Sequence, residues 1–320
     1  MNPSPLISIL MPAYNAERFI SEAIHSILRQ DHPNWELLIL NDASTDKTPE
    51  IIAGFADTRI RVFHHTQQKG YLMSCNDLFQ KANGDFLTFL DADDACPENR
   101  LSRCLAEFAR DPELDFLSTD HTRTDVVGNV ISENTVVVDY LRYAADPHYN
   151  PTICCATLVF KRELLDATGG YRTFFQHIGG EDYFWLWELS KHGKGQHLQE
   201  QLYAYRQHSN QSSISHSNPL HLFFPELLTE LKKELLNTPW DDRIVERVAH
   251  RVETTYLHSD FEVSLRKAQI AMNRKEPGLF GLVSDTFLRI RKPEQLKRSA
   301  YLVYSWAARK LRHRTLQLDS

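Results

Sequence analysis

The sequence lacks any long apolar run. Its longest apolar stretches, residues 153–160 and 301–308, are far shorter than the roughly 20 residues that a membrane-spanning helix needs. The first residues, MNPSP, contain no basic segment, so we expect no signal peptide. The five cysteines form no C-x-x-C pair, which favours a reducing compartment. These absences predict a cytoplasmic protein, with at most peripheral contact at the inner face of the cytoplasmic membrane.

Glycine is also scarce, with 12 residues in 320, and no glycine-rich loop follows the first expected strand. A dinucleotide-binding oxidoreductase would carry G-x-G-x-x-G at that point, and a sugar nucleotidyltransferase would carry a glycine-rich phosphate loop. The segment is instead PAYN, residues 12–15. Both classes of enzyme are therefore disfavoured.

Positive and negative charges are unevenly distributed along the chain. The net charge is −6, but residues 289–314 hold nine Lys or Arg and a single acid, so the rest of the chain carries −14. An acidic body argues against a nucleic-acid binder, whose basic surface would belong to the main fold. The basic tail has helical spacing with nearby Tyr and Trp. It can contact an anionic membrane or a partner, a second copy of the chain included, or pack on its own domain.

What is present is a globular composition with 42% hydrophobic and 24% charged residues. Apolar strands alternate with helices over the first 120 residues, which predicts an α/β fold with a mostly parallel sheet flanked by helices. We expect strands at residues 6–11, 35–40, 59–64, 85–90 and 114–119, and helices at residues 16–30, 47–55, 71–82 and 97–110.

Beyond residue 120 the pattern changes. We expect a β-hairpin at residues 121–138, strands at 151–161 and 197–205, a helix at 181–192, and only helices after about residue 219. The predicted organisation is a catalytic domain over residues 1–215 and a helical extension over residues 216–320.

Acidic and polar side chains follow three of the expected strands. Asn15 follows the first strand, Asp42 ends the second, and the D-x-D pair Asp91 and Asp93 ends the fourth. The carboxyl ends of parallel strands are where open α/β sheets bind ligands. Two carboxylates one residue apart can share Mg²⁺ or Mn²⁺ with a diphosphate. The alternative is a solvated turn before Pro97.

Several ordered blocks then resemble the inverting glycosyltransferases of family 2, which have the GT-A (Rossmann-like) fold. The blocks are ISILMPAYN (7–15), AIHSILRQ (23–30), WELLILNDASTD (35–46), GDFLTFLDADD (84–94), GGY (169–171), GED (180–182) and YRQH (205–208) with Ser212 and Ser213. The resemblance implies an enzyme that moves a sugar from a nucleotide-sugar donor, a UDP-sugar first of all, to a glycan or lipid-linked acceptor. It also implies work in cell-surface polysaccharide biosynthesis.

The resemblance assigns the nucleotide to the first strand ends. Pro12, Ala13, Tyr14 and Asn15 would line the base, with Tyr14 available for stacking, and Asp42 would hydrogen-bond the base edge. A packing role at a strand end is the alternative for Tyr14.

The resemblance places the donor diphosphate and a Mn²⁺ or Mg²⁺ ion at the D-x-D pair. Asp91 would lie near the ribose and the metal, Asp93 would bind the metal, and Arg206 would lie beside the diphosphate. His208 would complete the metal shell, or it is an ordinary surface or core histidine. Asp94 either assists or caps the next helix.

The base that an inverting transfer needs is implied in the GED block. Asp182 would take the proton from the acceptor hydroxyl, and Glu181 would orient it or the acceptor. The start of a helix favours an ionised carboxylate, which is the state that a base requires. Both acids could instead only complement the helix dipole.

The sequence departs from the family pattern at two places. Cys75 replaces an arginine, so Asn76 is expected to keep the polar contact to the donor, and Lys69 is the candidate that balances the D-x-D charge. Phe184 and Trp185 follow the GED block, where they form either an acceptor platform or the core face of the helix. A glycan- or partner-binding relative without catalysis stays the rival function, but it predicts decay of the acidic residues.

Overall fold

The computed structural model describes residues 4–208, 219–257 and 260–274, together with residues 286, 289, 290 and 295. The chain divides into two compact units, residues 1–216 and 217–320. Most of the basic tail, which is predicted to form an amphipathic helix, lies outside the described residues. Within the described part of the chain, no helix is both long enough and apolar enough to cross a membrane.

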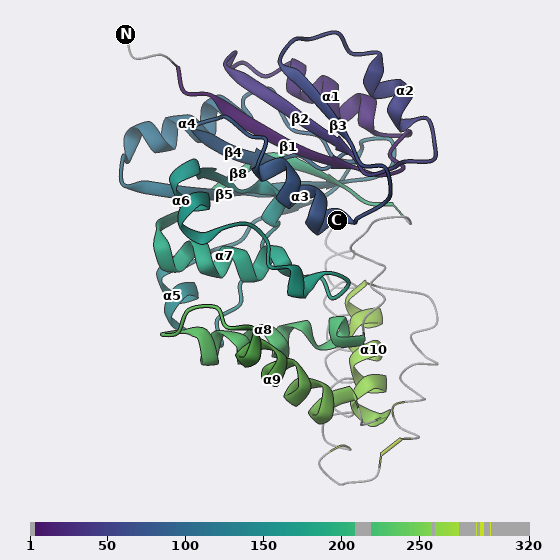
Figure 1. The fold of residues 1–320 in the computed structure, drawn as a ribbon, viewed down its shortest axis with the longest axis vertical. Coiled ribbons are helices and arrows are strands. Elements are labelled where there is room, and N and C mark those ends of the chain that lie inside the picture. Colours follow the sequence, from purple (N-terminus) through teal and green to yellow (C-terminus); the bar gives the residue numbers. More distant parts are fainter. Residues whose placement is uncertain are drawn as a thin grey trace, which may run out of the picture. The chain divides into compact units, whose positions relative to one another are not determined.

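The first unit is built on one eight-stranded sheet (Figure 1). Its strands are β1 (Ile7–Ala13), β2 (Trp35–Asn41), β3 (Ile60–His64), β4 (Phe86–Phe89), β5 (Leu114–Thr124), β6 (Val130–Asn134), β7 (Val159–Lys161) and β8 (Lys194–Arg206). The order is β3-β2-β1-β4-β7-β5-β6, and β8 pairs with β5. Strands β3, β2, β1 and β4 are parallel, as are β5 and β8, whereas β7 is antiparallel to both of its neighbours. The expected mostly parallel sheet is confirmed.

Helices cover both faces of this sheet. They are α1 (Ile20–Leu28), α2 (Thr48–Ala53), α3 (Tyr71–Phe79), α4 (Arg100–Arg110), α5 (Tyr140–Ala145), α6 (Arg162–Thr168) and α7 (Glu181–His192). Helix α1 buries Ile20, Ile24 and Ile27 against alternate residues of β1 and β2, because apolar residues three and four apart share one helix face. On the other face, the rings of Phe79, Phe160 and Trp185 meet at 5.0–6.3 Å between centroids.

Two sequence expectations are settled by this packing. Phe184, Trp185 and Trp187 of α7 are each at most 1% exposed, so they form the core face of the helix and not an acceptor platform. The strand expected over residues 151–161 is wrong for residues 151–158, of which 155–157 form a 3₁₀ turn, and the strand is confined to Val159–Lys161. The Thr157 hydroxyl donates to the carbonyl of Cys154, which closes that turn locally.

The second unit is helical where it is described. Its elements are a 3₁₀ turn at Pro219–Phe223, α8 (Phe224–Leu235), α9 (Asp242–Val252), a π-helical turn at Glu253–Leu257, and α10 (Asp260–Arg274). Leucines 227, 228, 231 and 235 of α8 are buried together with valines 245, 248 and 252 of α9. The three and four-residue spacing of these side chains gives each helix one apolar face.

Candidate functional site

The carboxyl ends of β1, β2, β4 and β8 meet at one edge of the sheet, because these strands run in the same direction. Tyr14 follows β1, Asp42 follows β2, and the loop Asp91–Asp94 follows β4. Across this edge the amide of Asp42 donates to the carbonyl of Ala13 over 2.8 Å. The topology therefore brings together the strand-end residues that the sequence singled out.

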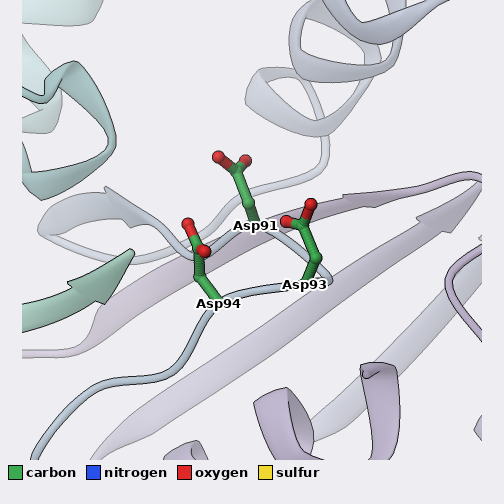
Figure 2. A group of neighbouring side chains, drawn as sticks. All are labelled: Asp91, Asp93 and Asp94. Atoms are coloured by element: carbon green, nitrogen blue, oxygen red, sulfur yellow. The ribbon is translucent and has the colours of Figure 1, made fainter. Parts of the chain in front are cut away.

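Three side chains of the β4 loop extend to the same side and bring their carboxylates near one another, as Figure 2 shows for Asp91, Asp93 and Asp94. One oxygen from each lies within 4.8 Å of the others, a spacing that a metal ion can bridge. Burial raises the pKa of Asp91 to about 7, and the charge of Asp93 adds to that rise. Burial, followed by the charges of Asp93 and Asp91, also raises the pKa of Asp94. A hard divalent cation is the partner that suits such crowded oxygen ligands.

The end of β8 clamps this loop from the other side. The Tyr203 hydroxyl donates to Asp94 Oδ2 over 2.8 Å and accepts from the amide of Asp91 over 3.2 Å. The amide of Arg206 donates to Asp94 Oδ1 over 2.7 Å. Asp94 is 1% exposed and is held by these contacts, so it fixes β8 to the loop and does not cap α4, which begins at Arg100 after Asn99.

Arg206 and His208 differ in how they approach the acids. The Arg206 guanidinium is buried, donates to the carbonyls of Asp93 and Asp125, and pairs with Glu22 over 2.7 Å. That geometry favours a role in positioning the loop, and contact of Arg206 with a donor stays a prediction. His208 Nε2 lies 2.8 Å from Asp93 Oδ2, which leaves His208 beside the predicted metal.

The β1 and β2 loops form the next part of the edge. Tyr14 is 44% exposed, as a side chain available for stacking must be. Asn15 has a positive φ of 49° and accepts from the amide of Thr45 over 2.9 Å. Asn15 therefore joins the two loops, while Pro12 and Ala13 are buried in β1 below them.

Asn76 and Lys69 both contact other residues of the chain. The Asn76 amide donates to the carbonyl of Tyr171 and accepts from its amide, both over 2.8 Å, so it secures the turn at residues 169–171. The Lys69 ammonium pairs with Asp77 over 3.2 Å, not with the D-x-D acids. The expectation for Lys69 is therefore wrong, whereas contact of Asn76 with the donor stays a prediction.

A buried cation that the sequence reasoning missed lies beneath the acidic loop. Arg100 is fully buried, and its guanidinium donates to Phe89 O, Thr88 Oγ1 and Ala156 O. Its positive charge opposes the rise in the pKa of Asp91. In the sequence, Arg100 differs from the other arginines only in that it precedes Leu101, the first residue of the apolar face of α4.

Glu181 and Asp182 begin α7 immediately after Gly180, whose φ of 84° requires the left-handed conformation that glycine adopts without strain. Burial and the adjacent Asp182 charge raise the pKa of Glu181 to about 8. Burial also raises the pKa of Asp182, although the amide of Tyr183 donates to it. For both acids the loss of water on burial thus outweighs the stabilisation that a helix start gives to a charged carboxylate.

The comparisons with known proteins decide the family. A sequence profile described as "Glycosyl transferase family 2" matches residues 8–169. The chain belongs to glycosyltransferase family 2. It is 32% identical over 164 residues to a Bacillus subtilis protein named putative teichuronic acid biosynthesis glycosyltransferase TuaG, covering 51% of this chain and 64% of that protein.

A second family 2 relative is the Escherichia coli protein WfgD, named UDP-Glc:alpha-D-GlcNAc-diphosphoundecaprenol beta-1,3-glucosyltransferase. It is 32% identical over 185 residues, which cover 57% of this chain and 68% of WfgD. The chain thus spans about two thirds of the length of these relatives.

Solved structures share the fold of this family 2 chain. S. aureus TarS in complex with UDP-GlcNAc superposes with a TM-score of 0.60 at 17% identity, covering 88% of each chain. The mannosyltransferase PcManGT from Pyrobaculum calidifontis, solved with GDP-Man and Mn²⁺, gives a TM-score of 0.53 at 20% identity, covering 97% of this chain and 88% of that one. The GT-A architecture predicted from the sequence is confirmed.

Proposed function

We propose that the protein is an inverting, metal-dependent glycosyltransferase that uses a UDP-sugar and acts in cell-surface polysaccharide biosynthesis. Its acceptor is a hydroxyl of a glycan, and a lipid-linked glycan is the first class to test. The names of TuaG and WfgD support the process and the acceptor class, and the nucleotide sugars bound to TarS and PcManGT support the donor class.

The observation that carries the proposal is the arrangement of acids at one edge of the sheet. The Asp91–Asp94 carboxylates form a cluster fit for a divalent cation, and the charge of Asp182 contributes to the raised pKa of Asp91. A second pair of acids, Glu181 and Asp182, thus includes a carboxylate close enough to the cluster for its charge to raise the pKa of Asp91. A metal-binding group and a separate basic group are the two parts that an inverting transfer requires.

The site residues have separate roles in binding the donor. Tyr14 stacks on the base and Asp42 accepts a hydrogen bond from its edge. Asp91 and Asp93, with His208 beside them, would hold Mn²⁺ or Mg²⁺, and the bound ion would supply positive charge to stabilise the leaving diphosphate.

Asp182 acts on the acceptor. It takes the proton of the acceptor hydroxyl while that oxygen bonds to the anomeric carbon from the face opposite the diphosphate, and the bond from carbon to the diphosphate breaks. Its raised pKa makes Asp182 a stronger base than an exposed aspartate.

The test is a panel of nucleotide sugars with purified protein and MnCl₂ or MgCl₂, read out as released nucleoside diphosphate and as transfer to a lipid-linked glycan. Asp93→Asn should weaken metal binding and lower turnover on the order of 100-fold. Asp182→Asn should lower turnover by about 10²–10⁴-fold and leave UDP affinity near the wild-type value, because a base acts only in the chemical step.

Asp166→Asn is the matched control, since this exposed acid lies on α6 away from the sheet edge. Full turnover of either site variant contradicts the mechanism. Nucleotide-sugar binding without turnover by the wild-type protein, with every acceptor in the panel, supports the rival binding function.

A further inference from the structure

We infer that His65 is a positioning residue for nucleotide recognition, which holds Asp42 so that it accepts a hydrogen bond from a nucleobase that carries a ring N–H. The inference rests on the proposed function, in which Asp42 meets the base. His65 lies just beyond β3, outside every sequence block that resembles the family.

The Asp42 carboxylate has most of its hydrogen-bonding capacity in use. Oδ1 lies 2.6 Å from His65 Nδ1 and accepts from the amide of Lys69 over 2.9 Å. Oδ2 accepts from the amide of Gly70 over 2.8 Å. Each carboxylate oxygen offers about two acceptor sites, so these contacts fill Oδ1 and leave one site on Oδ2.

The second nitrogen of His65 is also engaged. Nε2 lies 2.8 Å from Asp77 Oδ2, and the ring is 8% exposed. Burial alone would raise the pKa of Asp77, but hydrogen bonds from His65 and Lys69 lower it below its usual value. Both ring nitrogens therefore lie within hydrogen-bonding distance of a carboxylate oxygen, so the ring bridges Asp42 and Asp77.

The contacts with His65 and with the amides of Lys69 and Gly70 fix the orientation of the Asp42 carboxylate. A carboxylate free to turn could present either oxygen, whereas a carboxylate held by His65 and two backbone amides presents one remaining acceptor site. The ligand must supply a donor to that site. Uracil does so through N3–H, whereas the corresponding ring nitrogen of cytosine has a lone pair and would face the carboxylate oxygen without a proton.

The experiment compares UDP and CDP binding by calorimetry in MnCl₂, together with kcat and KM for the UDP-sugar that the panel identifies. His65→Ala should weaken UDP binding and raise the donor KM by about 10-fold, the effect of losing a hydrogen bond to a charged group. It should shrink the preference for UDP over CDP and leave kcat at saturating donor within about 2-fold, because the reacting atoms lie elsewhere.

His65→Gln provides a second variant that can still donate to Asp42. It should retain more of the UDP preference than His65→Ala, and it serves as the test if His65→Ala does not fold. His32→Gln is the matched control: His32 is also buried, but it contacts Pro5 O and Asn34 O near the opposite ends of β1 and β2. A general loss of packing would affect the control in the same way.

UDP affinity and UDP preference unchanged in His65→Ala, or lost equally in His32→Gln, overturn the inference. A fall in kcat with an unchanged donor KM also overturns it. If the wild-type protein itself binds no nucleotide, the proposed function fails and not the role of His65 alone.

Discussion

Glu181 lies in surroundings that oppose its charge. Burial and the neighbouring Asp182 raise its pKa from an ordinary value near 4.5 to about 8. The folded protein therefore keeps a proton on Glu181 between pH 4.5 and 8, while the unfolded chain releases it. Because the folded state binds more protons in this window, the free energy of unfolding falls as the pH rises through it.

Glu181→Gln removes the free-energy cost of ionising a buried carboxyl group at high pH. At pH 9 the variant should have a higher free energy of unfolding than the wild type by at least about 1 kcal/mol, the equivalent of roughly one pKa unit. At pH 4 the two proteins should differ little, since Glu181 is protonated in both states. Urea unfolding at both pH values measures the difference, and the exposed Glu163→Gln on α6 is the control. A stability gain that is the same at pH 4 and pH 9 would refute the raised pKa.

Some residues of the site could be identified from the sequence alone, and others could not. Asp42, Asp91 and Asp93 could be identified because each directly follows an apolar strand, so the topology places them at one edge. His65 and Tyr203 could not, because their importance arises from contacts with residues 12 to 112 positions away. No local pattern distinguishes His65 from the other histidines of the chain.

At the scale of elements, β8 is the part of the sheet that holds the acidic loop in place. Its Tyr203 hydroxyl bonds both Asp94 and the amide of Asp91 in a buried setting. Removing that hydroxyl leaves a buried carboxylate oxygen short of a donor, which costs more than the loss of an exposed hydrogen bond.

Tyr203→Phe should therefore lower the free energy of unfolding by about 1–3 kcal/mol. Tyr149→Phe, which removes a hydroxyl that accepts from the amide of Asp139 at the surface, should lower it by clearly less. Denaturant unfolding of the two variants makes the comparison. Equal losses would mean that the buried contact between β8 and the acidic loop contributes no more to the free energy of unfolding than a surface hydrogen bond does.

Elements differ in how well the sequence predicts them. Helix α7 begins and ends at the expected residues, because Gly180 and Gly193 flank it and its aromatic side chains need a core. The position of β7 between β4 and β5 was not predictable, since strand order depends on pairing between segments more than 40 residues apart. The sheet edge that holds the site was predictable, because it needs only parallel strands.

The whole molecule carries a charge asymmetry: residues 289–314 contribute +8 and the remainder −14. We propose that the basic segment brings the enzyme to an anionic membrane, where a lipid-linked acceptor would be found. Each Lys or Arg near such a surface contributes about 1 kcal/mol, and salt screens the attraction.

The full chain should therefore cosediment with vesicles containing phosphatidylglycerol at low ionic strength. It should be released at about 1 M NaCl, where the Debye length falls to about 3 Å. A chain ending at residue 288 should stay in the supernatant under both conditions and still bind UDP. Cosedimentation of the shortened chain to the same extent would assign the attraction to another part of the molecule.

The long separation between the acidic loop and β8 has a consequence for synthesis of the protein on the ribosome. Asp94 precedes its partner Arg206 by 112 residues. At about 5–20 residues per second, the loop exists for roughly 6–22 s before β8 emerges to bind it. During that interval β1 to β4 can assemble, but the Asp94 carboxylate lacks its donor and the amide of Asp91 lacks its acceptor, both of which are the Tyr203 hydroxyl. The predicted metal site therefore gains its contacts from β8 late, and a nascent chain that stops before residue 203 lacks them.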